Sequence, residues 1–409
     1  MSLRFFSLLF IGWLLQGTSG ATPLHVYLTW QGDTGTTMTV NYHTLGESSV
    51  SQVYYDTVAR GGAPEAYSHR ATGTGHQVPG LADGRIVHWV ELTELEPGDI
   101  YYFIAGDAAS GFSAEYKFRT APADDRTIRF VSGGDMTPGK RARRLLARAG
   151  ERDPLFALVG GDLAYVNGKT KKYSKWDQWL ENWQENMVTP DTCMVPMVLA
   201  IGNHEVQGGY GQDPTRAPFY YGYFAQAGER AYFSRRFGAN MILYALDSGH
   251  TAAHGGAQAQ WLADEMRHTR DMPYRFALYH VPLYPAFRSQ EDAYSTEGRQ
   301  HWLPLFDEYR LTAAFENHDH VLKRSKLLRR DQIDDKGTLY LGDGCFGKSP
   351  RLLKGPRRRD RSKRWYLAHV TSIAHFWLVD LSPEQVVFRA IDEDGDVVDE
   401  YELPRPAVP

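Results

Sequence analysis

The hydrophobic pattern of the chain changes near residue 121, and this change limits the folds that are open to it. Between residues 23 and 120, apolar and polar residues alternate in short runs that Gly and Asp clusters separate. This pattern predicts the short strands of an all-β domain. After a linker at Ala121–Asp125, apolar runs alternate with amphipathic stretches of helical period, one of them over Gly298–Tyr309. We therefore expect an α/β domain in which helices cover one or two sheets. Residues 375–403 look like a closing antiparallel meander.

The first of these regions has the signals of a β-sandwich. Alternation is clear in Leu24–Trp30 and Met38–Tyr42, and turn residues follow at regular distances. Leu95–Tyr101 resembles the segment of fibronectin type III domains that ends in a tyrosine corner. We interpret residues 22–121 as a small immunoglobulin-like or fibronectin III-like sandwich. Support or spacing is its default role, and carbohydrate or protein binding stays open.

The first 21 residues have the layout of a secretory signal peptide. Arg4 supplies a positive charge, Phe5–Leu15 is almost entirely apolar, and Ser19 and Ala21 suit the small-residue positions that a signal peptidase reads. A transmembrane anchor is the weaker alternative, because a spanning helix needs about 20 apolar residues. We expect cleavage near Gly20 and a secreted or periplasmic mature protein without a membrane span.

Net charge and cysteine content narrow the partners and the redox chemistry. The formal net charge is −4 at pH 7, which predicts neither nucleic acid nor an anionic membrane as a partner. The chain has two cysteines, Cys193 and Cys345. Secretion would permit a disulfide between them, but two distant cysteines do not make a disulfide scaffold. We favour two buried free thiols.

Polar side chains gather directly after five of the predicted strands. The motifs are Gly133-Gly134-Asp135, Gly160-Gly161-Asp162-Leu163-Ala164-Tyr165, Gly202-Asn203-His204-Glu205, His280, and Glu316-Asn317-His318-Asp319-His320. Each motif alone is explained as well by a turn, a helix cap or a polar loop. Ligand sites of open α/β sheets lie beyond the carboxyl ends of the strands, however, so we expect these motifs to meet. Carboxylate, amide and imidazole groups bind divalent and trivalent metals, and their number suits two ions that share a bridging carboxylate.

This series of motifs resembles that of the purple acid phosphatases, within the calcineurin-like metallophosphoesterases. Seven ligand positions fall in the family order, and the N-terminal sandwich is similar to that of the plant-type members. The resemblance implies that residues 126–403 form a four-layer sandwich, with two mixed sheets flanked by helices.

The resemblance also implies a role for each ligand. A ferric ion would be held by Asp135, Asp162, Tyr165 and His320. A divalent ion (zinc, iron or manganese) would be held by Asp162, Asn203, His280 and His318, with Asp162 bridging the two ions. The Tyr165 phenolate would favour Fe(III), although a core tyrosine is the simpler interpretation of any single Tyr.

The implied activity is hydrolysis of the phosphate monoester of a small substrate by a metal-bound hydroxide. His204 would not bind metal but would hydrogen-bond the phosphate and the charge that develops on it. Family members often carry His residues shortly after the His280 motif, whereas here Pro282–Gln290 has none. Arg288 could bind phosphate there, but it cannot act as an acid because it does not lose its proton.

Other interpretations stay open where this sequence departs from the family pattern. The proton donor could be Glu205 or His301, and the substrate could be a phosphodiester or a nucleotide. A secreted binding protein with a structural metal site is the weaker alternative. Asn317 stands where the family usually has Gly, and Met136-Thr137 stands where a Gly is usual after the aspartate. We expect substrate preference to be most affected by these differences.

Two further sequence features have a simple structural interpretation. The basic run Lys354–Lys363 could attract an anionic substrate, but we favour a solvated loop. Trp176, Trp179 and Trp183 recur at helical spacing, which predicts packing rather than a substrate platform.

Overall fold

The computed structural model describes residues 23–46, 50–226, 228–342, 344–353 and 364–406. The predicted signal peptide and the basic run Lys354–Lys363 lie outside the described residues. Within these ranges, no helix is both long enough and apolar enough to cross a bilayer.

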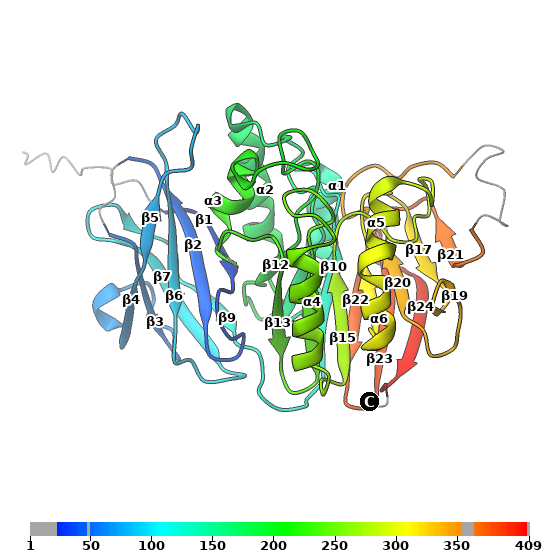
Figure 1. The fold of residues 1–409 in the computed structure, drawn as a ribbon. Helices are drawn as coiled ribbons and strands as arrows, with labels where there is room; N and C mark the ends of the chain where they lie inside the picture. Colours follow the sequence, from blue (N-terminus) through cyan, green and yellow to red (C-terminus); the bar gives the residue numbers. More distant parts are fainter. Residues whose placement is uncertain (1–22, 47–49, 227, 343, 354–363, 407–409) are drawn as a thin grey trace, which may run out of the picture.

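An all-β domain occupies the N-terminal end of the molecule (Figure 1). Its first sheet contains, in spatial order, β1 (Leu24–Thr29), β2 (Met38–Thr44), β6 (Ile86–Leu92) and β5 (Thr74–His76). Its second sheet contains β4 (His69–Thr72), β3 (Gln52–Asp56), β7 (Ile100–Asp107) and β8 (Gly111–Phe112), and β9 (Tyr116–Arg119) also pairs with β7. The Tyr101 hydroxyl accepts a hydrogen bond of 2.9 Å from the backbone N–H of Glu96, which is the contact expected of a tyrosine corner.

A buried histidine in this domain should make its stability depend on pH. His88 is 1% exposed, stacks on Tyr42, and has a ring nitrogen 2.8 Å from each of the Ser51 and Thr44 hydroxyls. Burial lowers the pKa of His88 to about 4. The imidazole of His88 is therefore protonated below about pH 6.5 in the unfolded chain, but only below about pH 4 in the folded chain.

We expect the free energy of unfolding to fall by about 2 kcal/mol on this account as the pH drops from 7 to 4. Urea titrations across that range would measure the fall, and His88→Gln should make it smaller. An identical pH dependence in the variant would contradict the assignment to His88.

The second domain is built on two mixed sheets. In spatial order, the first contains β12 (Met197–Leu199), β11 (Phe156–Val159), β10 (Ile128–Gly133), β22 (His375–Leu381), β23 (Gln385–Asp392) and β24 (Val397–Pro404). The second contains β13 (Phe233–Phe237), β14 (Met241–Ala245), β15 (Tyr274–Leu278), β16 (Ala313–Phe315), β20 (Leu339–Gly342), β17 (Leu322–Ser325) and β21 (Leu367–Thr371). Strands β10, β11 and β12 run parallel, and so do β14, β15, β16 and β20.

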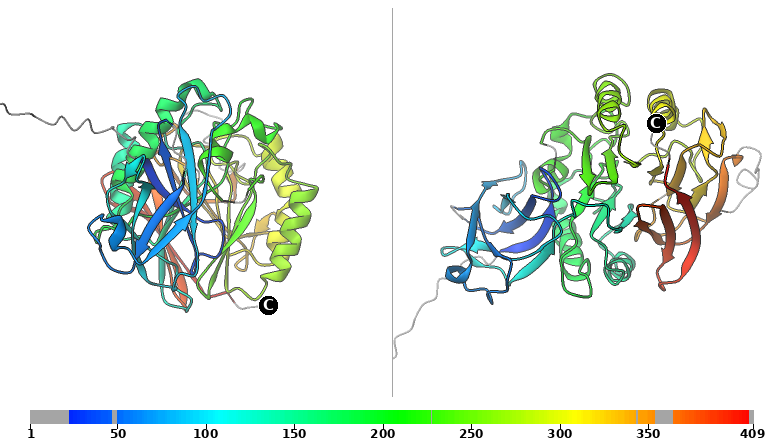
Figure 2. Two further views of the ribbon diagram at one scale, coloured as in Figure 1. Left: turned by 90° about the vertical axis from the view of Figure 1, so that its left-hand side faces the viewer. Right: turned by 90° about the horizontal axis from the view of Figure 1, so that it is seen from below.

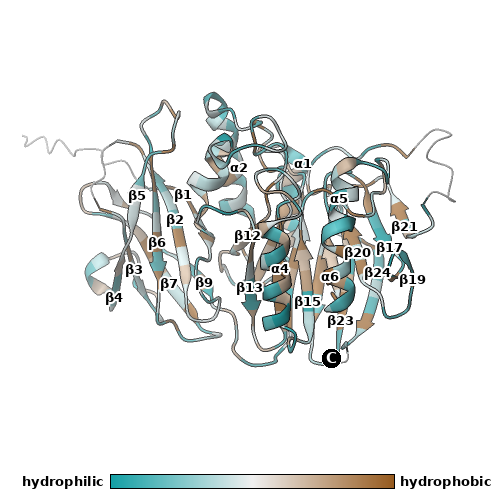
Figure 3. Ribbon diagram, viewed as in Figure 1, coloured by the Kyte–Doolittle hydropathy of each residue, from teal (hydrophilic) through white to brown (hydrophobic). Residues whose placement is uncertain are grey.

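Helices cover the outer face of each sheet (Figures 1 and 2). The first sheet is covered by α1 (Lys140–Gly150), α2 (Tyr173–Asn186) and α3 (Pro218–Tyr223). The second is covered by α4 (Ala257–His268), α5 (Ala293–His301) and α6 (Leu303–Glu308). Many strands of this domain are hydrophobic, whereas α4 is largely hydrophilic (Figure 3). The predicted α/β fold with two sheets between helices is confirmed.

Aromatic packing holds the layers and the two domains together. Phe130 of the first sheet and Phe276 of the second meet between the sheets, at 5.9 Å between ring centroids. Trp30 of the N-terminal domain packs its ring edge against Phe237 at 5.5 Å. The three tryptophans of α2 are buried in the core between the first sheet and its helices, so their predicted packing role is confirmed. Cys193 and Cys345 are both buried and free.

One helix prediction needs correction. The single helix expected over Gly298–Tyr309 is two helices, α5 and α6, which meet at Trp302. Pro304 occupies the first turn of α6. Proline has no backbone N–H, and its ring would clash with a carbonyl of the preceding turn in a continuous helix, so the chain starts a new helix there.

Candidate metal centre

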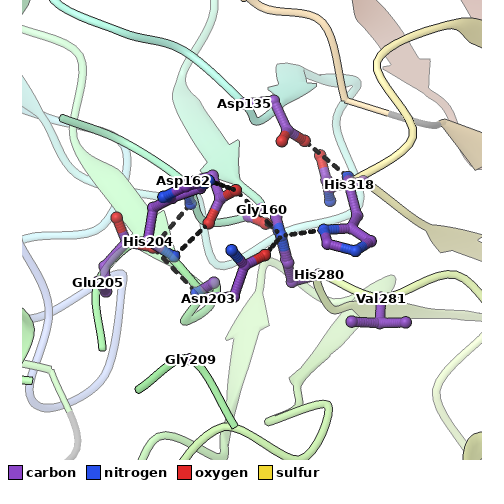
Figure 4. Close-up of polar contacts among 12 residues, drawn as sticks. Asp135, Gly160, Asp162, Asn203, His204, Glu205, Gly209, His280, Val281 and His318 are labelled. Atoms are coloured by element: carbon purple, nitrogen blue, oxygen red, sulfur yellow. Dashed lines mark hydrogen bonds and ion pairs between the residues drawn. The ribbon is translucent and has the colours of Figure 1, made fainter. Parts of the chain in front are cut away.

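The five strand-end motifs converge at one place, although they come from two sheets. Strands β10, β11 and β12 of the first sheet lead into the first three motifs. Strands β15 and β16 of the second sheet lead into His280 and into the loop that carries His318 and His320. Figure 4 shows Asp135, Asp162, Asn203, His204, His280 and His318 facing a common centre.

One group of ligand-type atoms forms around Asp135. Its Oδ1 lies 2.9 Å from the Tyr165 hydroxyl and 2.8 Å from His320 Nε2. The Tyr165 hydroxyl is in turn 3.1 Å from His320 Nε2. A carboxylate, a phenol and an imidazole therefore point at one position.

A second group forms around His280. Its Nε2 lies 3.0 Å from His318 Nδ1, 3.2 Å from Asn203 Oδ1 and 3.4 Å from Asp162 Oδ2. Asp162, His280 and His318 have ligand atoms that all lie within 4.8 Å of one another, and all three residues are buried. Two imidazole nitrogens this close need a proton or a cation between them.

Asp162 lies where the two groups meet. Its Oδ1 accepts a hydrogen bond of 2.8 Å from the His204 backbone N–H, and its Oδ2 faces His280. Burial, then the charges of Asp135 and Asp162, raise the pKa of the Tyr165 phenol well above its usual range. Asp162 therefore acts electrostatically on both groups, as a bridging ligand would.

The backbone at this centre is held in an uncommon conformation. Asp135, Asp162, Tyr165, His318 and His320 all have positive φ, between 53° and 78°. Such values are uncommon for residues other than glycine, and at functional sites they mark side chains that the fold holds against local preference. Gly344 has a related constraint, because a Cβ at that position would lie 1.9 Å from Asp135 Oδ2.

Hydrogen bonds from outside the two groups orient their imidazoles. His280 Nδ1 lies 2.8 Å from the Gly160 carbonyl oxygen, so it carries the proton and leaves Nε2 free as a ligand. The Tyr210 hydroxyl lies 3.3 Å from His318 Nε2, which leaves His318 Nδ1 facing the centre. Metal-binding histidines usually have such a partner on the second nitrogen.

Replacing Tyr210 with Phe should therefore weaken metal binding. The ring of Tyr210 stacks between His250 and Tyr294, at 4.7 and 4.0 Å, so Phe keeps the packing and loses only the hydroxyl. We expect affinity for the metal near His318 to fall about 10-fold to 100-fold, as measured by competition with a chelator. Tyr294→Phe is the matched control, and equal affinity in both variants would contradict a role for the hydroxyl.

The Asn317 difference from the family pattern is accommodated by packing. Cβ atoms built at Gly134 and Gly160 would lie 2.4 and 1.8 Å from the Asn317 side chain. The Asn317 amide also donates to the Tyr279 carbonyl oxygen at 3.0 Å. The larger side chain thus fits because two glycines lie beneath it.

Glu205 is buried and stabilises the backbone near the centre. Its carboxylate is buried and accepts backbone N–H groups of Asp162, Leu163 and Gly202, at 2.7, 2.8 and 2.9 Å. These bonds hold the second motif against the third. His301 lies on α5 beside Gly255, and its described contacts include none of the predicted ligands. Neither placement favours the two residues as proton donors.

His204 reaches the centre from the third motif and remains 31% exposed in its side chain. Its Nδ1 bonds the Asn167 side-chain oxygen, and its Nε2 lies 3.7 Å from Asp162 Oδ2. Its ring packs on that of Tyr165 with centroids 4.2 Å apart. Asn167 was not singled out by the sequence analysis, since only its position after Tyr165 could have suggested it.

Three cations lie at the edge of the centre, and only Arg288 among them stands near a sequence motif. Arg288 Nη1 donates to the His318 carbonyl oxygen and to Asp319 Oδ1, both at 3.1 Å. Lys348 Nζ lies 3.8 Å from the centroid of the Tyr165 ring. Arg351 Nε lies 3.4 Å from His320 Nδ1. Lys348 and Arg351 belong to no motif, and their position follows from the fold alone.

Comparison with known proteins agrees with the fold and with the motifs. Residues 23–120 match the family "Purple acid Phosphatase, N-terminal domain", and residues 139–322 match "Calcineurin-like phosphoesterase". An uncharacterized protein of Mycobacterium tuberculosis is 27% identical over 408 residues, which cover 85% of this chain and 74% of that protein. Purple acid phosphatase 13 of Arabidopsis thaliana is 25% identical over 300 residues, covering 64% of this chain and 54% of that protein.

Solved structures show the same fold at lower identity. A purple acid phosphatase from yellow lupin (Lupinus luteus) seeds superposes with a TM-score of 0.76 at 18% identity, covering 95% of this chain and 75% of the lupin chain. The structure of PhoD superposes with a TM-score of 0.70 at 11% identity, covering 96% of this chain and 94% of that one.

The domain matches and the fold define this protein as a metallophosphoesterase, an enzyme that hydrolyses phosphate esters. Because the N-terminal domain also matches, the chain combines a purple acid phosphatase N-terminal domain with a calcineurin-like phosphoesterase domain.

Proposed function

We propose that this enzyme hydrolyses phosphate monoesters at a centre of two metal ions. Asp135, Asp162, Tyr165 and His320 would hold Fe(III), and Asp162, Asn203, His280 and His318 would hold a divalent ion (zinc, iron or manganese). The observation that carries the proposal is the convergence of these seven side chains into two groups that meet at Asp162.

The donor atoms fit the proposed ions. The first group offers two carboxylates and a phenol, which are hard ligands suited to a trivalent ion, and the second offers the two imidazoles. Although burial opposes its charged form, Asp162 raises the pKa of His280 to about 9, so without metal a proton compensates the carboxylate. A bound cation would replace that proton. When bound, the two ions supply positive charge that polarises the phosphoryl oxygens and activates water.

The remaining residues would bind and orient the phosphate. His204 is held by Asn167 and is partly exposed beside both groups, so it can donate a hydrogen bond to a phosphoryl oxygen. Arg288 is held by Asp319 and the His318 carbonyl oxygen, and its positive charge attracts phosphate without supplying a proton. A monoester, with two negative charges, suits Arg288 and the two proposed metal ions better than a diester with one.

Two aryl phosphates would test this proposal. We expect purified enzyme to hydrolyse a monoester faster than the matching diester, and Asp162→Asn to lower both activities strongly. Faster hydrolysis of the diester would favour the second candidate, a phosphodiesterase or nucleotide hydrolase. That candidate is supported by the burial of Glu205 and by the position of His301 against Gly255, which favour neither residue as proton donor. Esters with good leaving groups would then be the easiest substrates. No turnover of either ester by metal-loaded enzyme would refute both.

We also propose secretion or periplasmic export, supported by the N-terminal sequence pattern. The proposed boundaries of the mature domains remain 22–121 and 126–403, a division that agrees with the change from all-β to α/β structure. Mass determination of the protein purified from its own host would test cleavage near Gly20. An intact N-terminus would contradict export by this signal.

A further inference from the structure

Two of the three cations at the metal centre have no acidic partner in the part of the chain that the structure describes. Among the described residues, Lys348 and Arg351 form no ion pair with a carboxylate, whereas Arg288 pairs with Asp319 at 3.1 Å. The side chains of Lys348 and Arg351 are neither fully buried nor fully exposed. Partly desolvated cations without partners are unfavourable in the free enzyme, so their placement needs a reason outside the chain.

The fold holds both residues firmly against the ligands of the proposed ferric site. The Lys348 backbone N–H donates to the Asp135 carbonyl oxygen, and that of Arg351 donates to the His320 carbonyl oxygen, both at 2.9 Å. The Lys348 ammonium lies over the Tyr165 ring, and the Arg351 guanidinium lies 4.9 Å from the centroid of the Phe287 ring. The two cations therefore border the Tyr165–His320 half of the centre.

The cations also act on one another. Burial and then the charge of Arg288 lower the pKa of Arg351, and Arg351 is among the charges that lower the pKa of Lys348. The charges of Asp135 and Asp162 act on Lys348, and bound metal ions would neutralise both carboxylates. In the metal-loaded enzyme Lys348 thus loses that compensation, while Asp319, which acts on Arg351, already pairs with Arg288.

We propose that Lys348 and Arg351 form a second anion subsite, and that the preferred substrate carries a second phosphoryl group on its leaving side. This inference rests on the proposed function, because the first phosphoryl group is the one that the metal centre would hold. In the reaction, water supplies the oxygen of the new P–O bond and the P–O bond to the leaving group breaks. The departing oxygen takes up a proton, and the product that leaves retains the second phosphoryl group.

Two aryl substrates with similar phenol leaving groups test the proposal, and inorganic pyrophosphate adds a phosphate leaving group for comparison. The values of kcat/KM would be measured for phenyl phosphate, benzene-1,3-diyl bisphosphate and inorganic pyrophosphate. We expect kcat/KM of the wild type to be about 10-fold to 100-fold higher for the bisphosphate than for phenyl phosphate. Below, the ratio means this quotient of the two kcat/KM values. Lys348→Gln and Arg351→Gln should each lower this ratio about 10-fold, through KM. Arg143→Gln, an exposed α1 cation paired with Glu185 at 2.9 Å, is the matched control.

The outcomes separate this inference from the proposed function. A ratio that is the same in the wild type and in both variants would overturn the subsite, while turnover of phenyl phosphate would still support the phosphatase. Turnover of none of the substrates would refute the proposed function itself. Lys348→Gln and Arg351→Gln could lower kcat/KM relative to phenyl phosphate for the bisphosphate but not for pyrophosphate. That result would identify the ligand as a bisphosphorylated ester rather than an anhydride.

A binding measurement gives a readout that does not depend on turnover. Methylenebisphosphonate and methylphosphonate cannot be hydrolysed at a P–O–C bond, and calorimetry would compare their affinities. We expect the bisphosphonate to bind at least 10-fold more tightly to the wild type, and this difference to shrink in Lys348→Gln and Arg351→Gln. Equal shrinkage in Arg143→Gln would show only a general effect of net charge and would contradict the subsite.

Discussion

Asp162→Asn is expected to lower kcat for an aryl phosphate monoester by on the order of 10³-fold, because the two metal ions lose their common ligand. Loss of metal charge at the centre removes several kcal/mol of transition-state stabilisation, and about 4 kcal/mol corresponds to this factor. The amide keeps the shape of the carboxylate, and its oxygen can still accept the His204 backbone N–H that Asp162 Oδ1 accepts at 2.8 Å. Steady-state kinetics and metal analysis of the same preparation would measure both effects.

The metal content of Asp162→Asn tests the bridging role more directly than kcat does. We expect it to fall from two ions per chain toward one, because an amide does not bridge two cations as a carboxylate does. Asp213→Asn is the control, since Asp213 is exposed in the same domain and caps a short helix at Thr215. Full metal content and near-wild-type kcat in Asp162→Asn would show that Asp162 is not the bridge.

His204→Ala is expected to have the second largest effect, a fall in kcat of about 10²-fold to 10³-fold with two metal ions still bound. The reason is that His204 lies beside Asp162 and Tyr165, while its Nδ1 hydrogen-bonds the Asn167 side-chain oxygen. Its loss should therefore remove stabilisation of the phosphoryl charge and leave the ligands in place.

His301→Ala is the control, and it also tests His301 as the alternative functional histidine. His301 lies against Gly255 on α5, so its removal should leave kcat unchanged if His204 contacts the phosphate. A large loss in His301→Ala, with little loss in His204→Ala, would make His301 the functional histidine and would contradict the placement of His204.

The sequence anticipated much of the fold because periodicity is a local property. Alternation predicted the strands of the N-terminal domain, and the closing meander was expected over residues that form β22, β23 and β24. The break at Trp302 was missed because the apolar period continues through it, while Pro304 interrupts only the backbone hydrogen bonds. The insertion of β22 beside β10 joins residues about 250 positions apart, such as Phe130 and Val379, and no local pattern shows it.

The candidate site divides in the same way. The seven ligand-type residues could be named because each follows a strand and has a metal-binding side chain, and their family order supported the choice. Tyr210, Asn167, Lys348 and Arg351 could not be named, because tyrosine, asparagine, lysine and arginine are common on any surface. Glu205 looked like a candidate acid in the sequence, and only its three backbone hydrogen bonds show a structural place.

The sequence by itself therefore determined the elements, the two-domain division and the chemical type of the candidate ligands, since these depend on residues close together in the chain. The tertiary structure decided that two sheets bring their strand ends to one centre and that five of those ligands adopt positive φ. It also placed two cations at the border of the centre that pair with no carboxylate among the described residues. These properties arise from contacts between residues far apart in sequence, where packing, burial and charge act together.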